Sequence, residues 1–406
     1  MRDPASIEDL RLRARGRLPR MAFDFIDGGA DAETTLRANE AGFEAVRLRT
    51  RTLVDVSARD SSTTVFGDRY ALPLAIAPTG MSRLAARAGD LAGARAAARS
   101  GAGFTLSTMS SHSIEEVAAA APDAPLWFQL YIWRDPEIAP RLIERARRAG
   151  YRVLVLTTDV PVVGNRLRDR RNGFVFPPKI RPGTALDLLR HPRWLAQAPS
   201  AMRFANVEES ETRNPMAHAA LVQKLLGSDT ATWERFDELR QQWDGPLVVK
   251  GVITVEDAVS AADHGADGIV VSNHGGRQLD GLPATIEALP AIAAAVGSRL
   301  TVMLDGGVRR GSDLVKARAL GARACLIGRP WLYGLAADGE RGVDAALDLF
   351  ATELDRTLAL LGVPRLDDVD ASVLCDAERS SLVPNTATND ERSAPATPRT
   401  DGSGGA

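Results

Sequence analysis

The chain has 406 residues, of which 45% are hydrophobic and 25% are charged. This composition is that of a globular protein, and the length fits either two or three domains or one large α/β barrel with additions. The 50 basic and 52 acidic residues almost cancel, so the overall charge gives no reason to expect nucleic acid as a partner. Two distant cysteines, a charged N-terminus and the lack of an apolar run of membrane-spanning length predict a cytoplasmic protein without a secretory signal.

The N-terminal part, residues 5–42, is predicted to form short helices before any repeating pattern begins. Ser6 and Asp9 resemble a capping box at the start of the first helix. Asp31 is expected to cap a later helix that runs to Glu40.

From residue 72 onward, a short β-rich run, a polar or glycine-containing strand end and a helical stretch follow one another eight times. The predicted strands are 72–77, 103–106, 126–128, 153–156, 247–249, 268–271, 301–304 and 324–327. Alternation of this kind indicates a parallel sheet, and eight units predict a (β/α)8 TIM barrel. An open doubly wound sheet is the alternative, but no GxGxxG motif follows the first strand.

Additions to the barrel divide the rest of the chain. Residues 178–228 form a long insertion between the fourth strand and its helix, and 363–378 are predicted to pack against the barrel. From residue 380 the chain is rich in Ser, Thr, Pro, Asn, Asp and Gly, which predicts a disordered tail over 380–406. We therefore expect one catalytic domain over 1–379.

A histidine, two glycines and an arginine follow the predicted strand at 268–271. A histidine can take up a proton near neutral pH, which makes His274 a candidate base. Arg277 can hold a carboxylate through two hydrogen bonds, and Gly275 and Gly276 allow a sharp turn beside a flat ligand. The combination predicts proton removal next to a carboxylate, whereas a lone loop histidine would not.

Glycine-bearing loops follow the last two strands. Residues 305–311 read DGGVRRG, and residues 328–330 read GRP. Backbone N–H groups and an arginine in each loop are typical of the phosphate site of a barrel. The alternative is that Gly306, Gly307 and Gly328 serve tight turns only.

Three further polar side chains end predicted strands. Lys250 needs an anion or an electron-rich ring if it points into the barrel mouth, but it could also extend into solvent. Asp159 could stabilise a nearby imidazolium, or cap a helix or pair with Arg166 or Arg168. Tyr131 could donate a hydrogen bond to a substrate or simply pack.

Together, these motifs resemble the FMN-dependent 2-hydroxy acid dehydrogenases and oxidases, a family that includes glycolate oxidase, L-lactate dehydrogenase and mandelate dehydrogenase. The resemblance runs from Leu18 to Gly362, and its most specific parts are SNHGGRQLDG at 272–281, DGGVRRG at 305–311 and IGRP at 327–330. It implies an FMN-binding barrel that oxidises an L-2-hydroxy acid to a 2-keto acid, and a homo-oligomer, with a tetramer as the expected form.

The resemblance also implies roles for individual residues. His274 would be the active-site base, paired with Asp159, and Tyr131 would bind near the substrate hydroxyl. Arg166 and Arg277 would hold the substrate carboxylate. The flavin would be lined by Pro78, Thr79, Gly80, Ser107, Gln129, Thr157, Lys250 and Ser272, and its ribityl and phosphate groups would be held by Asp305, Gly306, Gly307, Val308, Arg309, Gly328 and Arg329. No metal is expected.

One position departs from the family pattern. Phe25 stands where the family usually has a tyrosine that bonds the substrate carboxylate. Loss of that donor should weaken carboxylate binding by about 0.5–1.5 kcal/mol, and by more for a bond to a charge. A larger or aromatic 2-hydroxy acid is therefore the expected substrate, rather than glycolate.

The insertion and the electron acceptor are connected in the resembling dehydrogenases, where this region contacts the membrane and a quinone takes the electrons. Arginines beside leucines and Trp194 between 178 and 228 could form an interfacial membrane helix, or equally a lid over the active site. Soluble oxidases use oxygen instead. Gly80 stands where several oxidases have alanine, which favours a dehydrogenase on the inner face of the cell membrane.

Two other functions are compatible with the motifs. The first is an FMN-binding barrel with different chemistry, such as isomerisation, although His274, Arg166 and Arg277 as a set do not support it. The second is a flavin-binding protein that has lost catalysis, and Phe25 is the one feature that favours it.

Overall fold

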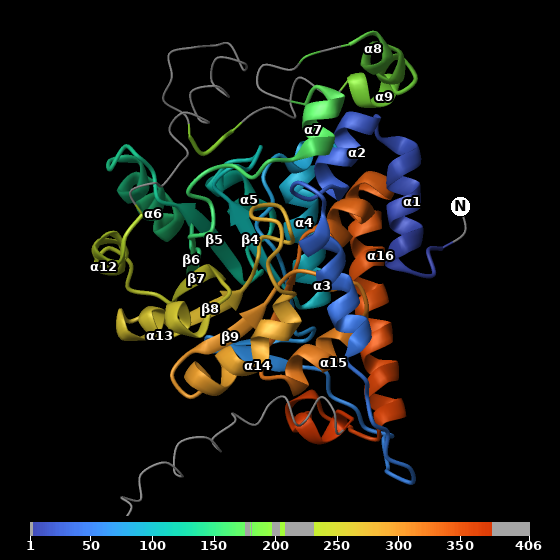
Figure 1. Ribbon diagram of the computed structural model, residues 1–406, viewed down its shortest axis with the longest axis vertical. Helices are drawn as coiled ribbons and strands as arrows, with labels where there is room; N and C mark the ends of the chain where they lie inside the picture. The colour runs from blue at the N-terminus through green and yellow to red at the C-terminus, as the bar shows by residue number, and fades with distance from the viewer. Residues whose placement is uncertain (1–2, 175–178, 180, 197–203, 208–230, 376–406) are drawn as a thin grey trace, which may run out of the picture.

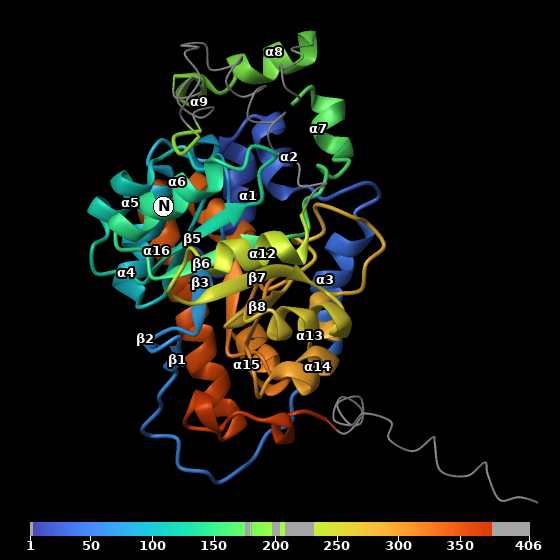
Figure 2. The same cartoon turned by 90° about the vertical axis from the view of Figure 1, so that its left-hand side faces the viewer.

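The computed structural model describes residues 3–174, 179, 181–196, 204–207 and 231–375. Figures 1 and 2 show a central barrel surrounded by helices. Its helices are α1 (Ile7–Arg17), α2 (Arg20–Asp27), α3 (Thr34–Ala45), α4 (Gly89–Ser100), α5 (Ile114–Ala120), α6 (Ile138–Arg148), α7 (Leu167–Asn172), α8 (Pro182–Leu189), α9 (Pro192–Leu195), α12 (Trp233–Arg240), α13 (Val255–Asp263), α14 (Thr285–Val296), α15 (Gly311–Ala319) and α16 (Arg329–Leu361). Its strands are β1 (Thr63–Val65), β2 (Asp68–Tyr70), β3 (Leu74–Ile76), β4 (Gly103–Ser107), β5 (Leu126–Tyr131), β6 (Val153–Thr157), β7 (Leu247–Val252), β8 (Gly268–Val271), β9 (Thr301–Leu304) and β10 (Ala324–Ile327).

The eight predicted strands form one closed barrel, in the order β10-β3-β4-β5-β6-β7-β8-β9. Every neighbouring pair is parallel. The prediction of a TIM barrel is therefore confirmed, and the open doubly wound sheet is wrong. Because all strands run in one direction, their carboxyl ends meet at one mouth, which is where catalytic residues of such barrels lie.

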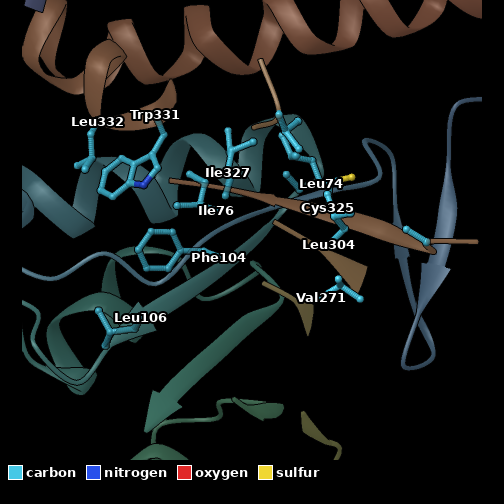
Figure 3. Packing of buried hydrophobic residues seen from close by; sticks show 14 of the residues in the cluster. Leu74, Ile76, Phe104, Leu106, Val271, Leu304, Cys325, Ile327, Trp331 and Leu332 are labelled. Carbon is cyan, nitrogen blue, oxygen red and sulfur yellow. The ribbon is translucent and has the colours of Figure 1, made fainter. Parts of the chain in front are cut away.

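Two hydrophobic cores follow from the alternation of side chains along each strand. Val153 and Val155 of β6 point into the barrel interior, together with Trp127, Val248, Val270 and Met303 from other strands. Leu154 and Leu156 point outward, into the larger core between strands and helices. Figure 3 shows part of this outer core, where Trp331 of α16 packs edge-on against Phe104 of β4 with ring centroids 6.4 Å apart.

A short hairpin closes the end of the barrel opposite the mouth, and sequence reasoning did not predict it. β1 and β2 pair in antiparallel fashion, and Tyr70 of β2 and Phe66 at the turn both contact the ring of Trp127. A Cβ on Gly268 would lie 2.8 Å from the Phe66 ring, so the start of β8 must be glycine to admit the hairpin. The hairpin seals the interior core from water.

The N-terminal helices confirm one part of the sequence prediction and correct another. The Ser6 side chain accepts a hydrogen bond from the Asp9 backbone N–H, which is one half of the predicted capping box, but the Asp9 carboxylate accepts from the Ala5 N–H instead of the Ser6 N–H. The expected cap by Asp31 is wrong: α3 begins at Thr34, and the carboxylate of Asp280 accepts hydrogen bonds from the backbone N–H groups of Thr34 and Thr35 in its first turn and of Ala32 just before it. The last helix, α16, begins at Arg329 directly after β10 and continues through a kink at 338–339.

The insertion is described only in part, and it lies at one end of the molecule. Figures 1 and 2 place α7, α8 and α9 together there, next to α2. Trp194 of α9 is buried and donates from its indole N–H to the Leu84 carbonyl, 2.8 Å away, whereas Leu186 and Leu189 of α8 are 53% and 71% exposed. None of the helices in the described ranges is long and apolar enough to cross a bilayer. The predicted tail over 380–406 lies outside the described residues.

Candidate active site

The imidazole of His274 and the carboxylate of Asp159 form the centre of the site. His274 Nδ1 lies 2.9 Å from Asp159 Oδ1, across the barrel mouth from β8 to β6. Burial alone would raise the pKa of Asp159, but the charge and hydrogen bond of His274 and the charge of Lys250 outweigh it, so this pKa is lowered. The carboxylate is therefore ionised and accepts from Nδ1–H, which leaves Nε2 of the imidazole for the cavity.

The approach of these two residues depends on a glycine. A Cβ on Gly251 would lie 2.7 Å from both Cβ and Cγ of Asp159, and the backbone there has φ of +109°. Asp159 forms no ion pair with Arg166 or Arg168 in the part of the chain that the structure describes. The alternative reading of Asp159 as a partner of those arginines is thus wrong.

A buried chain of polar groups supports the loop that carries His274. The Ser272 hydroxyl accepts from the His274 backbone N–H and from Lys250 Nζ, each at 3.0 Å. Lys250 also lies 2.9 Å from a carboxylate oxygen of Asp305. Burial would lower the pKa of Lys250, but Asp305 and Asp159 more than compensate, so the pKa is raised and the ammonium group stays charged. The partner that Lys250 was expected to need is, within the protein, Asp305.

Three arginines, Arg166, Arg277 and Arg329, line the same cavity, and we call them the pocket arginines. Arg329 donates to the carbonyls of Asp27, Gly28 and Gly275, and Arg277 Nη1 donates to those of Phe25 and Gly28. Among the described residues, Arg166 Nε has no hydrogen-bond partner, and no carboxylate forms an ion pair with any of the three.

The positive charge of the pocket arginines is destabilised by their surroundings. Burial lowers the pKa of all three, and for Arg277 the neighbouring charges of Arg166 and Arg329 lower it further. Asp169 of α7 partly offsets this through its charge. Guanidinium groups remain protonated in proteins, so the cavity carries excess positive charge and suits an anionic ligand.

Phe25 lies between two of these arginines. Its ring centroid is 5.2 Å from the guanidinium carbon of Arg277 and 5.8 Å from that of Arg166, distances typical of cation–π contacts. On another side it meets the ring of Phe174 at 4.9 Å. The phenyl ring thus stabilises the arginines without supplying the hydrogen bond of a tyrosine.

Tyr131, at the end of β5, also lines the cavity. Burial and the charge of Asp159 raise its pKa to about 12. Its hydroxyl therefore keeps its proton at neutral pH and can donate a hydrogen bond.

The structure brings the predicted residues into one cavity or directly behind it. The predicted residues that line the cavity are Phe25, Pro78, Thr79, Gly80, Tyr131, Arg166, Lys250, His274, Arg277, Asp305, Gly306, Gly307, Val308, Arg309, Gly328 and Arg329. The other five lie buried or partly buried at the strand ends behind it: Ser107, Gln129, Thr157, Asp159 and Ser272.

Residues 14–376 match the family of FMN-dependent dehydrogenases. An L-lactate dehydrogenase of Caulobacter vibrioides is 45% identical over 389 residues, which cover 92% of this chain and 98% of that protein. An L-lactate oxidase of Nostoc is 43% identical, with 91% and 98% covered. The structure of the monotopic membrane protein (S)-mandelate dehydrogenase superposes with a TM-score of 0.88 at 42% identity, covering 92% of this chain and all of that one.

The chain belongs to the FMN-dependent dehydrogenase family. Its residues fit an FMN at the barrel mouth, because buried polar atoms at four strand ends have no partner within the described protein. These atoms are Thr79 Oγ1, Gln129 Nε2, Thr157 Oγ1 and Asp305 Oδ1. The Ser107 hydroxyl donates to Gln129 Oε1 at 3.1 Å, which orients the free amide N–H groups as donors. Buried polar groups in native proteins have hydrogen-bond partners, so these atoms fit the polar groups of a bound FMN.

The expected phosphate end of this FMN dehydrogenase also fits its ligand. Gly306 and Gly307 both have φ of +87°, and Gly328 precedes the N-terminus of α16, where backbone N–H groups attract anions. Arg309 lies at the same loop, with Nη2 2.8 Å from a carboxylate oxygen of Glu40. These residues would hold the phosphate, while the strand-end polar atoms would hold the ring and ribityl chain.

Sequence reasoning missed the apolar part of the cavity. Met109, Val160, Val163 and Phe204 line it as well. Met109 and Val160 lie two and three residues after the ends of β4 and β6, so their position in the repeat could have revealed them, whereas Val163 lies six residues after β6. Phe204 comes from the insertion, far from any strand end, and no sequence signal pointed to it.

Proposed function

We propose that this protein oxidises an L-2-hydroxy acid with a lactate- or mandelate-like side chain to the 2-keto acid, using bound FMN. The observation that carries the proposal is the convergence of the His274–Asp159 pair with the pocket arginines in one cavity. A base beside excess positive charge suits a substrate that has both a carboxylate and a removable proton. Membership of the FMN-dependent dehydrogenases supports the flavin as the partner.

In this reaction, bound FMN would supply the acceptor for the two electrons that leave C2 of the substrate. Arg166 and Arg277 bind the substrate carboxylate and thereby fix the orientation of C2. His274 takes up at Nε2 the proton that the substrate releases, and Asp159 stabilises the resulting imidazolium through Nδ1. Tyr131, whose raised pKa keeps its proton in place, donates to the substrate oxygen.

The substrate side chain is proposed to be larger than that of glycolate. Phe25 contributes no hydrogen bond to the carboxylate, so part of the binding energy must come from elsewhere. Met109, Val163 and Phe204 give the cavity an apolar wall that a phenyl or alkyl side chain can cover.

The electron acceptor is proposed to be a quinone at the inner face of the cell membrane, with oxygen as the alternative. Leu186 and Leu189 of α8 are exposed beside the exposed Arg190 and Arg193, a combination that suits the interface of an anionic bilayer. Gly80 also favours this choice: a Cβ there would lie 2.8 Å from Met109 Cβ, so the alanine of several oxidases would require a shift. A homo-oligomer remains our prediction.

The test is a panel of glycolate, lactate and mandelate enantiomers offered to the purified protein, with either oxygen or a soluble quinone analogue. We expect turnover of the L-enantiomer of lactate or mandelate with the quinone analogue and little oxygen uptake. A yellow protein whose flavin no 2-hydroxy acid reduces would indicate different chemistry or lost catalysis. Flotation with lipid vesicles, with and without 178–228, tests the membrane part separately.

A further inference from the structure

Helix α3 lies against two loops of the site, and one buried side chain joins them. Asn39 of α3 and Asn273, the residue before His274, are each only 1% exposed. Asn39 Nδ2 donates to Asn273 Oδ1, and Asn273 Nδ2 donates to Asn39 Oδ1, both at 2.8 Å. The two amides therefore form a reciprocal pair.

Neighbouring backbone groups fix the orientation of both amides. Asn273 Oδ1 also accepts from the Gly276 N–H at 3.1 Å, and Asn273 Nδ2 donates to the Pro283 carbonyl at 3.0 Å. Asn39 Oδ1 accepts a second bond from the Thr285 N–H at 3.1 Å. Because each oxygen meets donors and each nitrogen meets acceptors, only one arrangement of the pair satisfies the site.

The same residues reach the glycine loop that follows β9. The Thr285 hydroxyl donates to the carbonyls of Asp305 and Gly306, at 2.6 and 3.2 Å. A Cβ on Gly307 would lie 2.2 Å from the Asn39 carbonyl oxygen, so this glycine packs directly on the helix backbone. Asn39 is thus in contact with both the His274 loop and the loop expected at the phosphate.

We propose that Asn39 is a positioning residue that holds the His274 loop in register with the FMN-phosphate loop. The distance between the proton acceptor and the flavin depends on the two loops moving as one unit. His274 itself has φ of 57°, a conformation that a non-glycine residue keeps only where the surroundings enforce it. The bond from the His274 N–H to the Ser272 hydroxyl holds the loop on one side, and the amide pair fixes the residue directly before His274 on the side of α3. This inference rests on the proposed function for the identity of the ligand.

The decisive variant is Asn39→Asp, which keeps the shape and both acceptor contacts but replaces the donor that faces Asn273 Oδ1. Two oxygens then face each other in a buried site without a hydrogen between them. The loss of this hydrogen bond should weaken FMN binding by about tenfold or more. We expect FMN to dissociate from the diluted holoenzyme about tenfold faster, as measured by the recovery of flavin fluorescence. We also expect anaerobic flavin reduction at saturating mandelate to slow by about tenfold, with little change in the half-saturating concentration.

Two further variants separate positioning from general destabilisation. Thr285→Val removes only the hydroxyl link to the glycine loop, and we expect the same signature at smaller size. Thr35 lies on the same helix as Asn39, and its hydroxyl accepts from the Gly281 and Leu282 N–H groups. Thr35→Val removes this acceptor and should lower the melting temperature without faster FMN release.

Normal FMN retention and normal flavin reduction in folded Asn39→Asp and Thr285→Val would overturn the inference. Equal FMN loss in Thr35→Val would also overturn it, because the effect would then be one of stability. A wild-type protein that holds FMN but is reduced by no 2-hydroxy acid would instead contradict the proposed function, and the FMN-release comparison would still stand.

Discussion

The C-terminal end of α2 separates two groups of arginines that differ in their partners. On one side, the Asp27 carboxylate accepts from Arg11, Arg168 and the Tyr333 hydroxyl. On the other side, the backbone carbonyls of the same turn accept from the pocket arginines Arg277 and Arg329. The first group, which we call the paired cluster (Arg11, Arg168, Asp27 and Tyr333), is neutralised within the protein.

The difference teaches which charges serve the fold and which serve a ligand. Carbonyl groups at a helix C-terminus hold a guanidinium in place without cancelling its charge. Arg277 and Arg329 are thus oriented but keep their charge for an anion, whereas Arg168 also pairs with Glu33 and is compensated. Substitutions on the pocket side should change chemistry, and those in the paired cluster should change stability.

The largest effect is expected at His274, on the pocket side. His274→Gln removes the proton acceptor while leaving a polar side chain, and general base catalysis contributes about 10²–10⁴-fold. We expect the rate of anaerobic flavin reduction to fall by about 10³-fold, measured by stopped flow, with FMN still bound. A fall of less than about tenfold would assign proton removal to another group.

Arg277→Met should have the next largest effect. It removes a charge-assisted contact to the substrate carboxylate, so kcat/KM for mandelate should fall about 10²-fold. The free energy of unfolding should hold steady or rise, because a buried charge without a carboxylate partner is lost. Urea titration of the variant checks this, and Arg277→Lys, which keeps a charge, serves as the matched control. A large loss of stability would show that Arg277 serves the fold, as the paired cluster does.

Asp27→Asn tests the paired cluster. Burial would raise the pKa of Asp27, but Arg11, Tyr333 and Arg168 lower it from 3.8 to about 2. This shift corresponds to about 2 kcal/mol of stability at neutral pH. Because the folded pKa is depressed, the contribution is present above pH 3.8 and is lost as the pH falls toward 2.

The prediction for Asp27→Asn is therefore a lower free energy of unfolding at pH 7 than in wild type, with a gap that narrows below pH 4. Urea unfolding followed by circular dichroism across this range measures it. The rate of flavin reduction by substrate at pH 7 should change little. A gap that is constant with pH would show that the lost carboxylate acts through packing rather than charge.

The smallest effect is expected for Phe25→Tyr. A new phenol donor beside Arg166 and Arg277 would add one hydrogen bond to the carboxylate, worth about 0.5–1.5 kcal/mol or a few-fold in kcat/KM. We expect the gain to be largest for glycolate and smallest for mandelate. The same preference for glycolate in both proteins would contradict the role given to this position.

Most of the barrel and its mouth could be predicted from the sequence, because buried strands are short apolar runs and reactive side chains directly follow them. Residues that depend on contacts distant in sequence could not. The cap of α3 is Asp280, far along the chain, so a local search chose Asp31 instead. Likewise, the partner of Lys250 is Asp305 on another strand, and periodicity carries no information about such pairs.

The insertion set another limit. Its mixture of leucines, tryptophan and arginines gave no period that assigns faces, so the membrane and lid interpretations were equal. The structure shows that single residues differ: Trp194 is buried against the barrel, Phe204 lines the cavity, and Leu189 is exposed. Burial of this kind is decided by tertiary packing, which a local pattern does not encode.

We propose above all that Arg166 and Arg277 bind a 2-hydroxy acid beside FMN and that His274 deprotonates it. The most direct measurement is an anaerobic titration of the yellow holoenzyme with (S)-mandelate or L-lactate, followed by the visible absorbance of the flavin. We predict rapid and complete bleaching in the wild type, and bleaching in Arg277→Met only at far higher substrate concentration. A flavin that stays oxidised with every 2-hydroxy acid, or equal titrations for both proteins, would contradict the claim.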